Sequence, residues 1–269
     1  MNNTFGFIGT GNMGGALATA AAKVMPSENI LLSNRTPEKA EALAKALGCK
    51  AVSVNDVAAK AGYIFLGVKP QMMAALLSDI APILANRKDS FVLISMAAGL
   101  TMDTIQNMAG GNYPVIRIMP NTPVAVGDGM TLYDATENVT DEQLSQFTGN
   151  MARSGVLDRL PEKLIDAGSA IAGCGPAFAC LFLEALADGA VACGLPRDKA
   201  LLYGEQMLLG TAKLAMESGQ HPGKLKDAVC SPGGSTIAGV GALEEGNFRG
   251  SAMNAVKAAY KRTKELGKQ

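Results

Sequence analysis

The sequence has no tryptophan, a single histidine and few aromatic side chains, which make up 5% of its 269 residues. It also has no excess charge, because 24 lysine and arginine residues balance 24 aspartate and glutamate residues. A chain without a cationic surface or aromatic stacking platforms is not expected to bind nucleic acid or an anionic membrane surface. Hydrophobic residues still make up 48% of the chain, which is enough for a substantial core.

Cysteine is also sparse, with five scattered residues and no Cys-x-x-Cys pair or Cys/His cluster. We therefore expect neither a disulfide framework nor a metal site, and we expect reduced thiols in a cytoplasmic protein. Cys230 is interpreted as a small apolar residue, because no histidine stands beside it to activate a thiolate.

Segments that could target or span a membrane are not expected either. Residues 1–4 carry no positively charged side chain, and the apolar run Phe5–Ile8 is followed at once by glycines. The longest uncharged stretch, Ala167–Leu183, contains Gly173-Cys174-Gly175-Pro176, which would interrupt a spanning helix. A core or interface helix is the better interpretation.

Apolar runs and helical patterns alternate through residues 1–160. This alternation predicts a Rossmann-type, doubly wound parallel sheet. The predicted strands are Thr4–Ile8, Asn29–Leu32, Ala51–Val54, Tyr63–Val68, Phe91–Met96, Val115–Met119 and Met130–Tyr133. The predicted helices are Ala16–Val24, Pro37–Leu47 with Thr36 as its N-cap, Gln71–Leu84 and Thr101–Met108.

Strand-like alternation disappears from Glu162 onward, where helical stretches are separated by short glycine- and proline-containing turns. Residues 161–269 therefore form the second predicted domain, which is all-α. Its small residues, such as Ala185, Ala187 and Gly189, permit close helix packing.

The first predicted strand runs into Gly9-Thr10-Gly11-Asn12-Met13-Gly14, which opens a helix. In this strand–turn–helix context the pattern predicts dinucleotide binding: Gly9 makes the turn, Gly11 admits the pyrophosphate, and Gly14 lets helix and strand approach. The alternative is a glycine-rich turn that binds nothing.

The end of the second predicted strand indicates which dinucleotide is bound. NAD enzymes place a carboxylate there, about 20 residues after the last glycine. This chain has Ser33-Asn34-Arg35-Thr36 instead, whose amide, cation and hydroxyls can bond a 2′-phosphate that a carboxylate would repel. NADP(H) is therefore expected as the preferred cofactor, with NAD(H) as a second option.

Three further loops follow predicted strands and could surround a nicotinamide. They contain Val68-Lys69-Pro70, Ala97 and Asn121 respectively. Lys69 could contact an anion, or it could be a surface lysine that Pro70 holds extended. The amide of Asn121 could bond the carboxamide of the ring, and we also expect an Asx-turn before Pro123.

A second loop suited to an anion lies near the C-terminus, at Ser231-Pro232-Gly233-Gly234-Ser235-Thr236. Its glycines let the backbone approach a ligand closely, and the apolar spacing of Ile237, Val240 and Leu243 predicts a helix directly after it. One end of the chain is thus suited to a cofactor and the other to a substrate.

A Rossmann domain followed by an all-α domain also occurs in β-hydroxyacid dehydrogenases. That family carries a catalytic lysine in a pattern close to Gly-x-Gly-x-x-x-Lys, whereas the matching stretch here begins at Gly173 and ends with Ala179. Oxidation of an alcohol needs a base at the hydroxyl, so this alternative is disfavoured. A regulator that senses NADPH without catalysis is a further alternative, against which the intact Ser231–Thr236 loop argues.

The chain resembles the pyrroline-5-carboxylate reductases over nearly its whole length, and the Ser-Pro-Gly-Gly-x-Thr loop is the most specific match. The other matching stretches are Phe7–Met13, Met119–Pro123, Gly173–Phe178, Glu184–Gly189, His221–Asp227 and Leu243–Arg249. The resemblance implies NAD(P)H-dependent reduction of 1-pyrroline-5-carboxylate to L-proline, the last step of proline synthesis. It also implies an interlaced homodimer formed through the helical domain, sometimes assembled into a decamer.

Site residues follow from the same resemblance. The Ser231–Thr236 loop would meet the nucleotide domain of the partner subunit. Ser231, Gly233, Gly234 and Ser235 would hold the substrate carboxylate, and Thr236 would hydrogen-bond the ring nitrogen as the catalytic residue. Ala97 and Asn121 would help to place the nicotinamide. A protonated cyclic imine is already electrophilic, so no metal or strong base is needed, and His221 is interpreted as a structural residue at a helix start.

Overall fold

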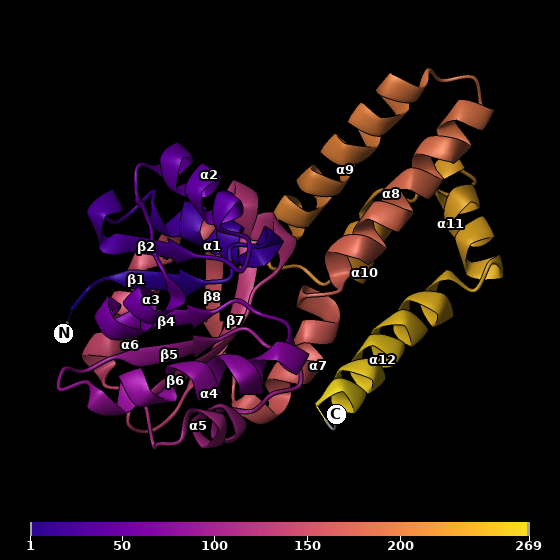
Figure 1. Ribbon diagram of the computed structural model, residues 1–269. Helices are drawn as coiled ribbons and strands as arrows, with labels where there is room; N and C mark the ends of the chain where they lie inside the picture. The colour runs from indigo at the N-terminus through magenta and orange to yellow at the C-terminus, as the bar shows by residue number, and fades with distance from the viewer. Residues whose placement is uncertain (1, 268–269) are drawn as a thin grey trace. The chain divides into compact units, whose positions relative to one another are not determined.

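The computed structural model describes residues 2–267 and divides the chain into two compact units. The first unit comprises Met1–Cys174 with the C-terminal segment from Ala259 onward, and the second comprises Gly175–Ala258. The sequence placed the boundary at residues 160/161. Helix α7 (Glu162–Ala172) belongs to the first unit because it packs on two strands of the sheet (Figure 1).

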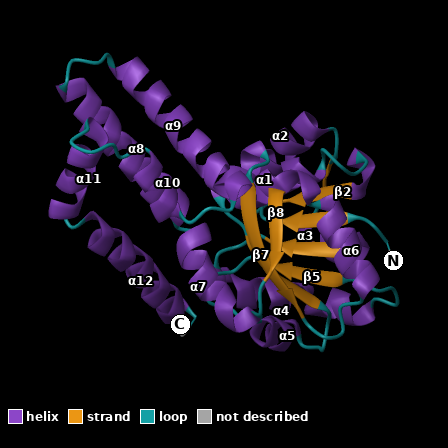
Figure 2. Ribbon diagram, turned by 180° about the vertical axis from the view of Figure 1, so that it is seen from behind, coloured by secondary structure: helices purple, strands orange, loops and turns teal. Residues whose placement is uncertain are grey.

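An eight-stranded sheet forms the centre of the first unit, in the order β3-β2-β1-β4-β5-β6-β7-β8 (Figure 2). All neighbouring strands are parallel except β6 and β7, which are antiparallel. The strands are β1 (Phe5–Ile8), β2 (Ile30–Ser33), β3 (Lys50–Ala51), β4 (Tyr63–Leu66), β5 (Val92–Ser95), β6 (Val115–Met119), β7 (Gly129–Ala135) and β8 (Gly155–Arg159). Because β2 and β4 flank β1, the winding reverses at β1, where ligands of such sheets bind.

Helices cover both faces of this sheet, which is why its central strands are apolar on both sides. One core joins the sheet to α1 (Asn12–Ala21), α2 (Pro37–Leu47) and α6 (Asp141–Asn150). The other joins it to α3 (Val54–Lys60), α4 (Pro70–Asn86) and α5 (Met102–Ala109). Strand β1 is buried along its whole length, and the rings of Phe7 and Phe65 stack with their centroids 4.3 Å apart. The predicted doubly wound fold is confirmed.

Short helical turns connect several of these elements: η1 (Ser27–Asn29), η2 (Thr122–Val126) and η3 (Ala152–Ser154). One predicted strand has different bounds, and one strand was not predicted. The expected strand at residues 51–54 ends at Ala51, because the Ser53 hydroxyl accepts a bond from the Asp56 N–H and starts α3. Strand β8 was missed, because its exposed and charged residues hide the pattern of a strand.

The second unit contains α8 (Gly175–Ala192), α9 (Arg197–Ser218), α10 (Pro222–Ala228), α11 (Ser235–Glu245) and most of α12 (Phe248–Leu266). Helices α8 and α9 pack side by side. Within α8–α11, the described residues that are fully buried are only Ala187 and Ala200. Many large apolar side chains remain exposed: Leu181, Leu202, Tyr203, Met207, Leu209, Leu214, Met216, Ile237, Leu243 and Met253. One copy of this unit therefore lacks a core of its own, which favours association with another copy.

By length and composition, the stretch Glu162–Ala192 is apolar enough to cross a membrane. Such a single stretch is weak evidence for a span, because core and interface helices have the same character. Its first part, α7, packs on β6 and β7, and the residues that separate α7 from α8 include Gly173. This arrangement favours the role of a core and interface segment.

Candidate functional site

The three glycines of the first loop have different geometric roles. Gly9 has a φ of +101°, and a Cβ built on it would lie 2.3 Å from the carbonyl oxygen of Gly67. A Cβ on Gly14 would lie 2.0 Å from the carbonyl oxygen of Gly9, so α1 and β1 approach as predicted. A Cβ on Gly11 would meet nothing within 4 Å, which leaves its backbone open to a ligand.

A cavity of about 720 Å³ lies beside this loop, at the carboxyl ends of β1, β2 and β4. It brings together seven of the predicted cofactor residues, namely Gly9, Gly11, Asn34, Arg35, Thr36, Val68 and Lys69. The remaining lining residues are Ile8, Lys39, Val54, Gly67, Gln71, Met72, Ala75, Leu76 and Asp79. Its position at the reversal of the winding is where a dinucleotide is expected.

The Asn34 side chain connects the glycine loop after β1 with the loop after β2. Its Oδ1 accepts a hydrogen bond from the Thr10 N–H at 3.1 Å, and its Nδ2 donates to the Thr36 carbonyl at 3.1 Å. The side chain therefore has a fixed orientation, and it holds the loop that carries Arg35 and Thr36 against the glycine loop.

Lys39 was missed by the sequence reasoning. It lies four residues after Arg35, in the first turns of α2, and both side chains are exposed at the cavity. None of the ion pairs found among residues 2–267 involves either cation. Its place in the first turn of the helix that directly follows this loop was the signal that could have identified it.

Several other predicted cofactor residues do not line this cavity. Ser33 is buried, and its carbonyl accepts the Gly9 N–H at 2.8 Å. Met13 packs against the core beneath α1, and Ala97 is buried at the end of β5. Asn12 and Pro70 are the first residues of α1 and α4. Their predicted roles as ligand contacts stay predictions.

Asn121 differs from its prediction. Its Oδ1 accepts a hydrogen bond from the Met130 N–H at 2.9 Å, and its Nδ2 donates to the Ala172 carbonyl at 3.0 Å. The side chain makes no capping bond to η2, so the predicted Asx-turn was wrong. Asn121 instead ties the loop after β6 to β7 and to the end of α7, because these segments leave a backbone donor and an acceptor within its reach.

The substrate loop predicted in the second unit begins a helix, as expected. Gly233 has a φ of +68°, which favours glycine, and α11 begins at Ser235 with Gly234 as its N-cap. A Cβ on Gly234 would lie 2.4 Å from the Ser231 hydroxyl oxygen and 3.2 Å from the Ser231 carbonyl oxygen, so the backbone here passes close to Ser231. No side chain caps the helix, and Ser231, Ser235 and Thr236 are all exposed. Uncapped N–H groups beside hydroxyls form a suitable site for a carboxylate.

His221 is confirmed as a structural residue at a helix start. It is the N-cap of α10, and its Nδ1 accepts a hydrogen bond from the Gly223 N–H at 3.1 Å. Across residues 2–267, no group of three or more His, Cys, Asp or Glu side chains could hold a metal ion.

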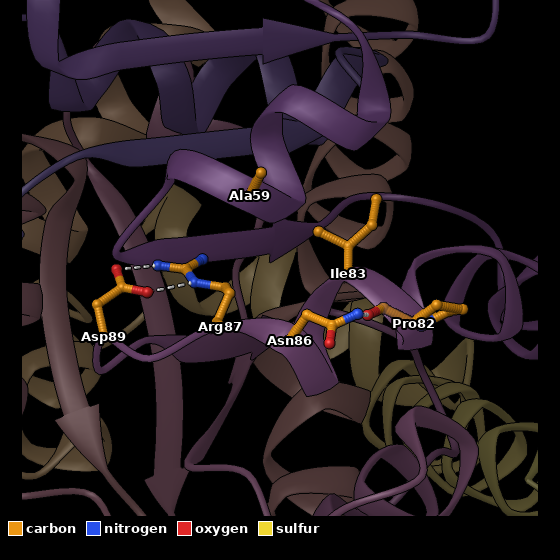
Figure 3. A pocket seen from close by; sticks show the side chains of 6 residues that line it. All are labelled: Ala59, Pro82, Ile83, Asn86, Arg87 and Asp89. Atoms are coloured by element: carbon orange, nitrogen blue, oxygen red, sulfur yellow. Dashed lines mark hydrogen bonds and ion pairs between the residues drawn. The ribbon is translucent and has the colours of Figure 1, made fainter.

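A hollow at the opposite ends of the strands has a structural explanation. It is lined by Arg87 and Asp89 with Ala59, Pro82, Ile83 and Asn86 (Figure 3). The Arg87 guanidinium donates to both carboxylate oxygens of Asp89, and to the carbonyls of Ala58 and Ala61. Asp89 thereby has a lowered pKa, chiefly through its hydrogen bonds from Arg87. With its donors engaged, this arginine fixes the end of α4 and leaves little for a ligand.

Comparison with known proteins identifies both halves of the chain. Residues 162–266 match the family described as pyrroline-5-carboxylate reductase dimerisation. Residues 4–99 match a family described as NADP oxidoreductase, coenzyme F420-dependent. A pyrroline-5-carboxylate reductase from Pisum sativum is 41% identical over 98% of this chain and 96% of its own length. The chain belongs to the pyrroline-5-carboxylate reductase family.

Other members of the family agree along their whole length. The Escherichia coli pyrroline-5-carboxylate reductase is 39% identical, with full coverage of both chains. A crystal structure of the Plasmodium falciparum pyrroline carboxylate reductase, with NADP bound, superposes with a TM-score of 0.89. Its sequence is 32% identical, and the alignment covers 99% of each chain. Membership makes this chain an oxidoreductase that uses a nicotinamide cofactor, and the dimerisation family accounts for the exposed apolar faces of α8, α9 and α11.

Proposed function

We propose that this protein reduces 1-pyrroline-5-carboxylate to L-proline, the last step of proline synthesis, with NADPH as its preferred cofactor and NADH as an alternative. The observation that carries the proposal is the pairing of two separate anion sites in one chain. The open Gly11 backbone lies at a cavity lined by three cations that form no ion pair among the described residues, Arg35, Lys39 and Lys69, and the uncapped start of α11 follows Gly233.

The residues at the cavity fit an NADP molecule. Gly11 leaves room for the pyrophosphate, and Arg35, Lys39 and the Thr36 hydroxyl can bond a 2′-phosphate. When bound, the cofactor supplies the hydride. The protein's part is to hold the substrate in place, and the exposed Ser231–Thr236 loop can do so. Its N–H groups and the Ser231 hydroxyl bind the carboxylate, and the Thr236 hydroxyl bonds the ring nitrogen.

Ala179 stands where β-hydroxyacid dehydrogenases have their catalytic lysine, and the proposed reaction does not need that lysine. The carbon of an imine that is protonated at nitrogen accepts a hydride directly, so the site must orient the substrate and supply a hydrogen bond rather than a base.

The exposed apolar helices favour an obligate homodimer, with a decamer as a higher assembly. The scattered cysteines, without a disulfide framework, favour a cytoplasmic protein. The zero net charge argues against nucleic acid or a membrane surface as a partner, which leaves a small molecule and further copies of the chain.

Turnover with the cyclic imine tests the proposal. The purified protein should oxidise NADPH when 1-pyrroline-5-carboxylate is added, and no turnover at saturating concentrations of both would refute the activity. Thr236→Ala should lower kcat roughly a hundredfold, since removing one well-placed hydrogen-bonding group has an effect of that size, while NADPH binding stays unchanged. Thr236→Ser keeps the hydroxyl and serves as the control. NADPH binding without any turnover would favour the regulator instead.

A further inference from the structure

The segment between β5 and α5 carries Ala97, which is predicted to contact the nicotinamide. Ala97 is buried, and the segment turns at Gly99, whose φ is +79°. It ends at Met102, the first residue of α5. In the structure this short segment is fixed from two directions by residues far away in the sequence.

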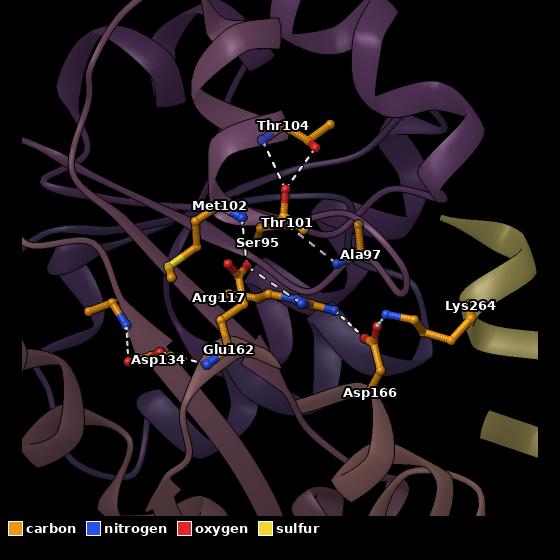
Figure 4. Close-up of polar contacts among 11 residues, drawn as sticks. Ser95, Ala97, Thr101, Met102, Thr104, Arg117, Asp134, Glu162, Asp166 and Lys264 are labelled. Carbon is orange, nitrogen blue, oxygen red and sulfur yellow. Dashed lines mark hydrogen bonds and ion pairs between the residues drawn. The ribbon is translucent and has the colours of Figure 1, made fainter. Parts of the chain in front are cut away.

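The first anchor is an ionic network under α5 (Figure 4). Glu162 Oε1 accepts a hydrogen bond from the Met102 N–H at 2.7 Å. Arg117, whose side chain is only 2% exposed, lies 3.5 Å from the same carboxylate oxygen and 2.5 Å from Asp166 Oδ1. The Nε of Arg117 has no partner among the described residues. Arg117 thus holds the Glu162 and Asp166 carboxylates together, and Glu162 in turn holds the start of α5.

The second anchor is the end of α12. A Cβ built on Gly99 would lie 2.6 Å from the Gly267 nitrogen and 3.1 Å from the Thr263 carbonyl oxygen, so the two backbones are in direct contact. Thr263 is buried at this contact. Lys264, in the same turn of α12, lies 3.7 Å from Asp166 Oδ2, which joins this anchor to the Arg117 network.

We propose that the end of α12, together with Glu162, positions the Ala97–Gly99 segment for the nicotinamide end of the cofactor. These are positioning residues, because they act through the backbone of Ala97–Met102. The inference rests on the proposed use of NADP(H), and it adds a role for the last turn of α12. A misplacement of this segment by about 1 Å is enough to lower turnover by up to a hundredfold.

Two ligands separate this role from a general loss of structure. NADPH contains the nicotinamide, whereas adenosine 2′,5′-bisphosphate contains only the adenosine end that the Arg35 side of the cavity would hold. We would measure the equilibrium Kd of both for the wild-type chain, for a chain ended after Arg262, and for Glu162→Ala. Glu162→Gln keeps an acceptor for the Met102 N–H. Lys261→Met serves as the control for the loss of a lysine on the same helix.

The Kd for NADPH should rise about tenfold in the shortened chain and in Glu162→Ala, while the Kd for adenosine 2′,5′-bisphosphate stays within about twofold. Glu162→Gln should recover part of the NADPH affinity, and Lys261→Met should match the wild type. Equal weakening of both ligands, or no change for either, would overturn the positioning role. Failure of the wild-type chain to bind NADPH would instead refute the proposed cofactor.

Discussion

The Asn34 side chain accepts the Thr10 N–H at 3.1 Å, so the glycine loop and the loop after β2 are joined by one amide. The same amide donates to the Thr36 carbonyl. Asn34 stands where NAD enzymes place a carboxylate, and here it holds two loops together rather than serving only as a neutral substitute.

Replacing Asn34 by aspartate should shift the cofactor preference. The introduced carboxylate would still accept the Thr10 N–H, but it would lose the donor to Thr36 and place a negative charge beside the 2′-phosphate. Asn34→Asp should therefore raise the Kd for NADPH roughly tenfold or more, and the Kd for NADH much less. Fluorescence titration with both cofactors measures this, and an equal loss for both would show that the charge at this position does not select the cofactor.

Lys39 should contribute to the affinity for NADPH through its charge. Lys39→Met removes one of the three cations that line the cavity and should weaken NADPH binding about tenfold, with NADH binding nearly unchanged. Lys45→Met is the matched control, because Lys45 is an exposed lysine in the last turn of the same helix. Unchanged NADPH affinity in Lys39→Met, measured at low salt, would contradict the assignment.

Asn121→Ala should lower the stability of the fold more than the affinity for NADPH. The substitution leaves the Met130 N–H and the Ala172 carbonyl without their partner, which costs about 2 kcal/mol and lowers Tm by several degrees. Asn107→Ala, at an exposed site on α5, should leave Tm unchanged. If thermal unfolding of Asn121→Ala matched the wild type while its Kd for NADPH rose, the nicotinamide contact predicted from the sequence would be the main role of this residue.

The ion pair of Arg87 with Asp89 predicts a pH dependence of stability. Its hydrogen bonds hold the pKa of Asp89 below the usual 3.8, so the contribution is complete above that value and is lost as the pH falls through the lowered pKa. Asp89→Asn should therefore be less stable than the wild type near neutral pH, and the difference should shrink below about pH 4. Urea unfolding across this range tests it, with Asp158→Asn as an exposed control. A constant difference at all pH values would exclude the charge as the cause.

Local demands on the chain explain which features the sequence predicts. Gly9 and Gly14 were assigned correctly because each meets a backbone neighbour that excludes a side chain. The end of α2 was also predictable, since Gly48 adopts a φ of +70° directly after its last turn. These signals lie within a few residues of the feature they mark.

Contacts between distant segments explain what the sequence could not predict. The partners of Asn121 lie 9 and 51 residues away, so nothing near Pro123 indicates them. Helix α7 belongs with the sheet because its Asp166 pairs with the buried Arg117, which comes 49 residues earlier. The exposed faces of α8–α11 belong to an interface that one chain does not contain.

Mixing two inactive variants would test whether the active site is shared between subunits. Gly11→Glu should fold, because a Cβ at this position meets no atom within 4 Å, but its side chain would enter the pyrophosphate position. Thr236→Ala would disable the loop at the start of α11. In a dimer whose loop serves the partner's nucleotide domain, a mixed dimer has one doubly defective site and one intact site. Unfolding and refolding the two variants together should then restore about a quarter of wild-type activity, since half of the dimers are mixed.

Each variant refolded alone should stay inactive, which makes it the control for this experiment. If the loop instead served its own chain, every site in a mixed dimer would carry one defect, and no activity would return. Mixed dimers confirmed by mass spectrometry, but without activity, would therefore exclude the shared site. Recovered activity would explain why the helical unit leaves its apolar side chains exposed in one chain: assembly would both bury those faces and complete the site.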